Sequence, residues 1–89
     1  MPTAQLTIIN RLGLHARAAA KFVQTAANYG CDVAISKGGK KVNGKSIMGV
    51  MMLAAGLGSE VVVETIGEQA DDALTALLAL INDKFGEGE

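Results

Sequence analysis

The chain is poor in cysteine, proline and aromatic residues. Its 89 residues include one cysteine, one proline, no tryptophan and three other aromatic side chains. Because Cys31 is alone, the chain can form neither an internal disulfide nor a CxxC zinc pair, and we interpret this residue as a small part of the core. The core must therefore be mainly aliphatic, in line with a hydrophobic content of 49%.

Long apolar runs are also missing. No stretch approaches the roughly 18 to 20 residues that span a bilayer, and the first ten residues, MPTAQLTIIN, lack the basic region and cleavage site of a signal peptide. We therefore expect a single cytoplasmic domain over residues 1–89 that makes no membrane contact. A chain of this length leaves no room for a separate catalytic domain.

Nucleotide-binding loops of the GxxxxGK[ST] or GxGxxG type do not occur, so no cofactor is expected. Charge is unevenly distributed: residues 1–59 carry seven basic side chains against one acidic, and residues 60–89 carry one basic against eight acidic. The basic part favours an acidic partner, phosphate or nucleic acid, unless it is simply a solvated surface. We expect no nucleic-acid binding, because stacking aromatics and an RNA-binding signature are absent.

Seven helices and strands are predicted from apolar periodicity and turn residues. Their order is strand, helix, strand, strand, helix, strand, helix, with a hairpin at Gly38 and Gly39. This order predicts an α+β fold in which three helices cover one face of a four-stranded antiparallel sheet. The expected ranges are 4–10, 16–29, 31–37, 40–43, 46–54, 60–66 and 70–85.

Two helices have stripes that define the faces expected to be buried. An acid-rich first turn over 68–72 suits the last helix, and the tail 86–89 is expected to fray. The first helix has its stripe at Ala16, Ala19, Ala20, Val23, Ala26 and Ala27, and the last helix at Ala70, Ala73, Leu74, Leu77, Leu78, Ile81 and Phe85.

The only histidine, His15, stands directly before a run of small helix-forming residues. As an N-cap it would lie beside the N–H groups of the first helical turn, where the helix dipole favours an anion such as phosphate. An imidazole nitrogen can accept a phosphoryl group, and the Arg17 guanidinium can neutralise its oxygens. We predict that His15 is a phosphoryl acceptor stabilised by Arg17 and by the backbone N–H groups of Ala16 and Arg17.

Other chemistry at His15 is disfavoured. Metal binding needs further ligands, and no histidine, cysteine or acidic cluster surrounds residue 15. A serine-type triad fails because no nucleophile and acid pair can be assigned. The simplest alternative is a histidine without a special role, followed by an exposed arginine.

Two segments carry a resemblance to a known family. GLHARAAAKF at 13–22 and GKSIMGVMMLAAGLG at 44–58 closely resemble the signature regions of HPr, the histidine phosphocarrier of the bacterial phosphoenolpyruvate-dependent phosphotransferase system. The resemblance covers essentially the whole chain and implies the open-faced β-sandwich fold. It also implies a stoichiometric, monomeric carrier that is not itself an enzyme.

By that resemblance, His15 is phosphorylated on Nδ1 by Enzyme I and passes the group to a histidine of an Enzyme IIA protein, with Arg17 contacting the phosphoryl group. The family usually has proline where this chain has Ala18, a change expected to loosen the helix start slightly without loss of function. The segments RAAAKF, MMLAAG and ALINDKF look more similar to the nitrogen-related NPr branch. An alternative function is therefore a regulatory binding module whose phosphorylation state controls partner proteins.

The second signature region also predicts a docking surface. A short helix cannot bury all of its large apolar residues, so an adaptable patch is expected near His15, unless the helix is simply overpacked into the core. Ser46 is predicted to be the N-cap of this helix and is also a candidate for regulatory phosphorylation by a serine kinase. The predicted docking residues are Ile47, Met48, Met52, Lys21 and Lys45, with Arg17 and Lys40 adding positive charge.

Overall fold

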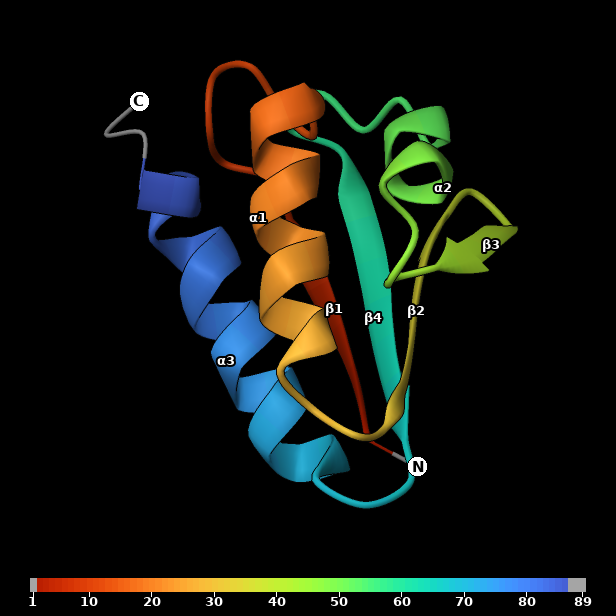
Figure 1. The fold of residues 1–89 in the computed structure, drawn as a ribbon. Helices are drawn as coiled ribbons and strands as arrows, with labels where there is room; N and C mark the ends of the chain where they lie inside the picture. Colours follow the sequence, from red (N-terminus) through yellow and green to blue (C-terminus); the bar gives the residue numbers. More distant parts are fainter. Residues whose placement is uncertain (1, 87–89) are drawn as a thin grey trace.

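A computed structural model describes residues 2–86 of the chain. The predicted order of helices and strands is confirmed, and a short 3₁₀ turn follows the last helix (Figure 1). The fraying expected of the tail concerns residues that, apart from Gly86, lie outside the described range. The elements are β1 (Thr3–Thr7), α1 (Ala16–Ala27), β2 (Asp32–Lys37), β3 (Lys40–Asn43), α2 (Ile47–Met52), β4 (Glu60–Ile66), α3 (Ala70–Asn82) and η1 (Lys84–Gly86).

The four strands form one antiparallel sheet in the order β1-β4-β2-β3. The glycines between β2 and β3 adopt positive φ angles of 57° at Gly38 and 87° at Gly39, which confirms the predicted hairpin. Figure 1 shows all three helices on one face of the sheet. The predicted open-faced arrangement is therefore confirmed.

The core lies between the sheet and this helical layer. Alternation along β4 turns Val61, Val63 and Thr65 inward and leaves Val62 and Glu64 on the other face, as a half-buried strand requires. The buried Thr65 hydroxyl donates to the carbonyl of Ala70 at 2.7 Å, so its burial leaves no donor unsatisfied. Cys31 is buried with a free thiol, which confirms its interpretation as a core residue.

The buried face of α1 differs from the predicted stripe. The structure buries Ala18, Ala19, Phe22 and Ala26, whereas Ala16 and Ala27 are exposed. Alanine has so little side chain that a run of alanines does not reveal which face of a helix is buried. Phe22, which the predicted stripe omitted, is the large residue that orients α1 toward the core.

The end of α3 also differs from the prediction. The helix stops at Asn82, and Phe85, predicted to continue its stripe, is fully buried from the 3₁₀ turn instead. Lys84, Phe85 and Gly86 all have positive φ angles, so the backbone reverses and returns the aromatic ring to the core. The burial of Phe85 was predicted, but its place within the helix was wrong.

Candidate functional site

His15 is the N-cap of α1, as predicted. Its backbone is extended (φ −71°, ψ 178°), and its carbonyl accepts the first helical hydrogen bond, from the Ala19 N–H at 2.8 Å. Among the described residues, the His15 side chain makes no capping hydrogen bond to the helix. The first N–H groups of α1 are therefore not used by the residue that usually caps them.

The first turn of α1 is uncommonly favourable to an anion. Its residues include no acidic side chain, and the side chains of Ala16 and Arg17 are exposed. Arg17 is the second residue of the helix, so its guanidinium extends from the same turn as the backbone N–H groups. The backbone N–H groups and this cation together favour a phosphoryl group at the helix start.

A tight loop fixes the chain that leads into His15. Gly13 has φ +65°, and a Cβ at this position would lie 2.5 Å from the Ala55 carbonyl oxygen and 2.6 Å from the Gly56 Cα. The next residue, Leu14, is buried and donates its N–H to the same Ala55 oxygen at 2.8 Å. The loop before α1 and the turn after α2 are therefore packed backbone against backbone (top of Figure 1).

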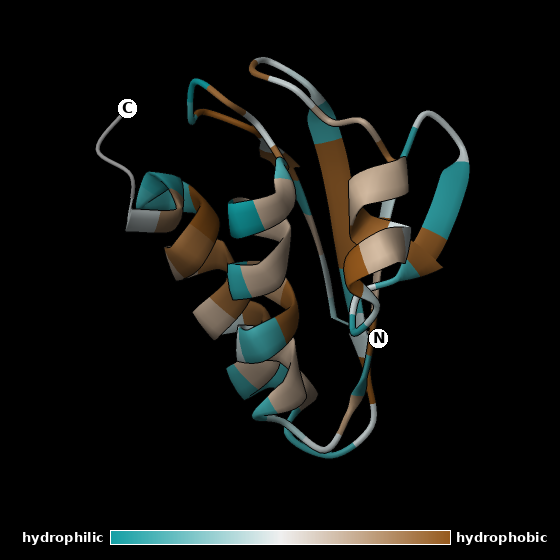
Figure 2. Cartoon of the chain, turned by 45° about the horizontal axis from the view of Figure 1, so that its top comes forward, coloured by the Kyte–Doolittle hydropathy of each residue, from teal (hydrophilic) through white to brown (hydrophobic). Residues whose placement is uncertain are grey.

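Helix α2 exposes most of its large side chains beside this turn. Figure 2 shows α2 coloured only from pale to brown, in contrast to the teal bands of α1. Its buried residue is Val50, so the alternative of an overpacked core helix is wrong. The exposed fractions are 74% for Met48, 63% for Met52, 43% for Ile47 and 42% for Met51.

Ser46 is the N-cap of α2, as predicted. Its Oγ accepts a hydrogen bond from the Gly49 N–H at 3.1 Å, and the residue is partly exposed. The hydroxyl therefore caps the N-terminal end of α2. The turn that contacts Leu14 follows the opposite, C-terminal end of this helix.

The two lysines predicted to dock partners are both tied to backbone carbonyls. Lys21 Nζ donates to the Phe85 oxygen at 2.5 Å, which links α1 to the C-terminal turn. Lys45 Nζ donates to the Tyr29 oxygen at 2.8 Å, two residues beyond the end of α1. Because twelve helical residues span about 18 Å, Lys45 lies at the opposite end of α1 from His15.

Sequence reasoning missed several contributors to this end of the molecule. Leu12 and Leu57 are 65% and 62% exposed, and they lie in the loop before His15 and in the segment after α2. Ala54, which follows α2 closely, has φ +53°, a left-handed angle that an alanine-rich segment does not predict. Gly56 and Gly58, on either side of Leu57, were the sign of an irregular backbone in this segment.

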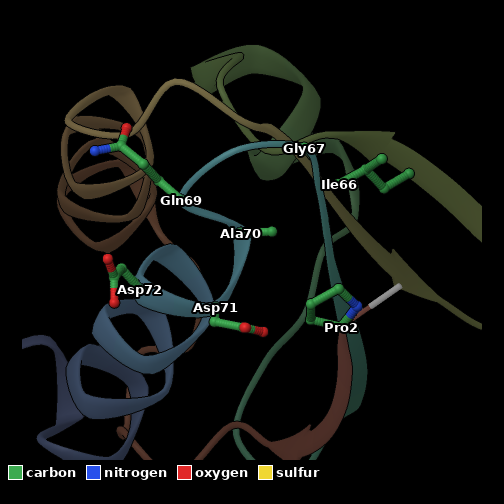
Figure 3. Close-up of a pocket in the computed structure, with 7 residues that line it drawn as sticks. All are labelled: Pro2, Ile66, Gly67, Gln69, Ala70, Asp71 and Asp72. Atoms are coloured by element: carbon green, nitrogen blue, oxygen red, sulfur yellow. The ribbon is translucent and has the colours of Figure 1, made fainter.

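One pocket of the described residues lies away from His15. It is open, measures about 610 Å³ and includes Gln69, Asp71 and Asp72 at the start of α3 together with Pro2 (Figure 3). Its carboxylates make it unsuitable for phosphate. His15 itself is partly exposed and is not among the residues that line this pocket.

Residues 2–86 contain no helix long and apolar enough to cross a membrane. Within the same part of the chain, no three His, Cys, Asp or Glu side chains are grouped so that they could hold a metal ion.

An anion-attracting helix start beside an exposed apolar helix suits the class of small proteins that receive a phosphoryl group from one protein and deliver it to another. Comparison with known proteins gives the family. A family model described as "PTS HPr component phosphorylation site" matches residues 2–83. The chain belongs to the HPr family of phosphocarrier proteins of the bacterial phosphotransferase system, which confirms the resemblance noted in its two signature segments.

Individual relatives match this chain over 93% or more of its length. The phosphocarrier protein HPr of Pseudomonas aeruginosa is 58% identical, with all of both chains covered. That of Cupriavidus necator is 60% identical over 93% of each chain. The crystal structure of an HPr from Thermoanaerobacter tengcongensis, 45% identical, superposes with a TM-score of 0.95 over 98% of each chain.

The predicted similarity to the nitrogen-related branch is not favoured. The phosphocarrier protein NPr of Shewanella violacea is 42% identical over 93% of this chain and 91% of its own length, below the 58% and 60% of the two HPr relatives. The short segments RAAAKF, MMLAAG and ALINDKF were too few residues to separate two branches of one family.

Proposed function

We propose that His15 is the residue that carries the phosphoryl group, received from Enzyme I and delivered to a histidine of an Enzyme IIA protein. The observation that carries this proposal is the position of the imidazole at the N-cap of a helix whose first turn has no acidic residue. A nitrogen of His15, Nδ1 by the family resemblance, attacks phosphorus, and the new N–P bond forms as the bond from phosphorus to the donor breaks. Delivery reverses these steps with Enzyme IIA as the nucleophile, so the carrier is regenerated and acts stoichiometrically.

The α1 start stabilises the group in transit. Charge on a transferring phosphoryl group is spread over three oxygens, and catalysis is mostly positioning and neutralisation of that charge. The backbone N–H groups of Ala16 and Arg17 face this region as a property of the helix start, and the Arg17 guanidinium supplies a forked donor. Because Ala18 is buried in the first turn, it replaces the family's usual proline without disturbing the exposed side of the site.

Partners dock on the apolar surface of α2. Met48, Met52, Ile47 and Met51 provide flexible thioether and aliphatic side chains that adapt to more than one partner. A patch of four residues on one short helix suits weak and rapidly exchanging complexes, as a carrier that serves two partners requires. We place the protein in the cytoplasm as a monomer, since it must diffuse between Enzyme I and Enzyme IIA.

Phosphorylation of His15 can be tested directly. Incubation with Enzyme I and labelled phosphoenolpyruvate should give one acid-labile phosphate per chain, with 31P–15N coupling to a nitrogen of the imidazole. Because His15 is the only histidine, the His15→Ala variant has no other imidazole to use and should remain unlabelled. Acid-labile label on that variant would overturn the assignment.

Docking can be tested separately from chemistry. Met48→Glu should raise the KM for this protein as a substrate of Enzyme I at least about fivefold, because a charge then lies in the apolar contact. Ile66→Glu is the matched control, since Ile66 is also an exposed aliphatic residue but lies at the far end of β4. Equal effects of the two substitutions would contradict docking on α2.

Ser46 is a second candidate site, for regulation. A phosphate on this residue would add about −1.5 to −2 charges next to Ile47 and Met48, at a helix start that tolerates an anion. A Ser46→Asp variant should therefore be phosphorylated on His15 more slowly, through a higher KM for Enzyme I. A serine kinase acting on the protein is the partner this role requires, and an unchanged KM in Ser46→Asp would argue for capping alone.

The alternative function, a regulatory binding module, gives a different result in the same assays. A regulator binds its targets through the Met48 surface according to phosphorylation state but need not pass the group on. If the protein is a carrier, purified phosphorylated protein should transfer its labelled phosphate to Enzyme IIA when the two are mixed. Binding to Enzyme IIA without loss of label would favour the regulatory module.

A further inference from the structure

The β2–β3 hairpin carries two lysines that both reach the end of α2. Lys37 and Lys40 flank the two turn glycines and are directly opposite each other in the antiparallel register. Opposed residues of two strands lie on the same face, so the two ammonium groups extend to the same side. Lys37 Nζ donates to the Ala54 oxygen at 3.1 Å, and Lys40 Nζ donates to the Met52 oxygen at 3.3 Å.

These carbonyls belong to the C-terminal end of α2 and the residue that follows its C-cap, Leu53. The last carbonyls of a helix have no partner within the helix and carry partial negative charge, so they favour a cation. Ala54 follows with φ +53°, the left-handed angle that reverses the chain there. The hairpin thus supplies from outside the capping that this helix end lacks in its own sequence.

The reversed chain is the support on which the His15 loop rests. The residue after Ala54 is Ala55, whose oxygen accepts the Leu14 N–H at 2.8 Å, and Leu14 precedes His15 directly. Gly13 packs against the same oxygen so closely that no Cβ fits. One peptide unit and one hydrogen bond therefore separate the lysine-bound carbonyl of Ala54 from the chain that sets the position of the imidazole.

We propose that Lys37 and Lys40 are positioning residues for phosphoryl transfer, which hold the turn at 53–56 in the shape that orients His15. This proposal rests on the proposed function of His15. The lysines touch neither the imidazole nor the transferring group. They act by fixing the backbone that joins the docking helix α2 to the phosphoryl acceptor, so that both present one rigid surface to a partner.

Steady-state kinetics with Enzyme I and phosphoenolpyruvate test the proposal. In the double variant Lys37→Met, Lys40→Met, kcat for phosphorylation of His15 should fall about threefold to tenfold while KM changes less than twofold, because a misplaced group costs rate after docking. The single variant Lys37→Arg should keep most of the native rate, because the arginine side chain also supplies a hydrogen-bond donor at this position. The loss should persist at 0.3 M salt, where long-range attraction between the proteins is screened.

Lys41→Met is the matched control. Lys41 lies on the same hairpin but pairs with Glu64 on β4 at 3.3 Å instead of capping α2, so its removal changes the net charge by as much as either single substitution, Lys37→Met or Lys40→Met. A rise in KM shared by Lys41→Met, or a loss abolished by salt, would mean that the lysines only attract an acidic partner and would overturn the proposal.

Amide hydrogen exchange gives a readout that does not depend on a partner. Exchange of the Leu14 N–H should accelerate at least about threefold in the double variant, and the NMR signals of the His15 imidazole should shift. The exchange rate of the Ala73 N–H in α3, which bonds to the oxygen of the N-cap residue Gln69, should not change. A uniform acceleration at both amides would indicate general destabilisation and contradict a positioning role. If the native protein is not labelled on His15, the proposed function itself is wrong. If the native protein is labelled and the double variant has an unchanged kcat, only the proposed role of the two lysines is wrong.

Discussion

The starts of α1 and α3 are built alike but are completed in different ways. Neither helix receives a capping hydrogen bond from the side chain of its N-cap residue within the described chain. The first turn of α3 contains Asp71 and Asp72, whereas that of α1 contains none and exposes Arg17. The start of α3 thus has acids at its own positive end, whereas the start of α1 has none and favours an anion. The proposed phosphoryl site depends on this absence of acids as well as on Arg17.

The N-cap residues show the same division of tasks. Gln69, with φ +66°, uses its side-chain oxygen to accept the Gly30 N–H at 2.7 Å, so it ties the start of α3 to the turn between α1 and β2. His15 occupies the matching position in α1, and we propose that partner proteins reach it there. Gln69 therefore stabilises the fold, whereas the role proposed for His15 is chemical.

Replacing Gly13 should have the largest effect on stability, because the start of α1 is held by a close backbone approach that α3 lacks. Gly13→Ala places a Cβ 2.5 Å from the Ala55 oxygen at a left-handed φ, and we expect it to lower the free energy of unfolding by about 3 kcal/mol. Gly38→Ala is the control, since it has a similar φ of 57° with no atom within 4 Å, and should cost about 1 kcal/mol. Urea denaturation measures both, and equal costs would mean that the close approach at Gly13 is unimportant.

Adding an acid to α1 should make its start resemble that of α3. In Ala16→Asp, the new carboxylate occupies the region of the phosphoryl group and repels it, so the rate of His15 phosphorylation should fall about tenfold, or about 1.4 kcal/mol in the barrier. The unfolding free energy should be unchanged or rise by up to about 1 kcal/mol, because the helix dipole favours the acid. Ala16→Asn separates charge from shape, and a rate as low as that of Ala16→Asp would show that shape alone is responsible.

Helix α2 offers a third start, one that is capped by its own side chain. Loss of the Ser46 hydroxyl in Ser46→Ala should lower the unfolding free energy by about 1 kcal/mol, since the Gly49 N–H loses its acceptor. Ser46→Asn keeps a capping acceptor and should retain most of the stability. Thermal denaturation in which Ser46→Ala matches the native protein would show that the cap contributes nothing.

Removing the acids of α3 should have the smallest effect. Asp71→Asn and Asp72→Asn are each expected to reduce stability by about 0.3 to 1 kcal/mol at low salt, and the difference should shrink at 1 M salt. The rate of His15 phosphorylation should not change, because the two helix starts are independent. Slower phosphorylation of His15 in either variant would contradict the independence of the α1 and α3 helix starts.

Regular periodicity made most of the fold predictable. The valines of β4 alternate strictly, the glycines at 38 and 39 mark a hairpin, and Ser46 precedes an apolar segment, so each local signal points to one structure. The start of α1 at Ala16 was predictable from its place after the irregular sequence around Gly13. The face of α1 was not predictable, because six of its twelve residues are alanines, which fit either side of a helix.

The site was predictable in part. The single histidine and the arginine two positions later indicated a site at residues 15 and 17. No local pattern predicts which atoms Lys21, Lys37 or Lys45 contact. Their partners are backbone oxygens 64, 17 and 16 residues away in the chain. Such contacts are fixed only by tertiary packing. A lysine that is close in sequence to a predicted site is therefore easily assigned to a partner protein when it in fact bonds within its own chain.

The register of the sheet has a consequence for synthesis on the ribosome. Within residues 2–86, β1 pairs with β4 alone, from Thr3 opposite Glu64 to Thr7 opposite Glu60, and the Leu14 N–H bonds to the Ala55 oxygen. The N-terminal segment is therefore made first but completed late, after more than sixty residues have emerged from the exit tunnel. A nascent chain stalled before Ala55 would lack the acceptor of the Leu14 N–H, so the loop that leads into His15 can be fixed only after α2 has been synthesised.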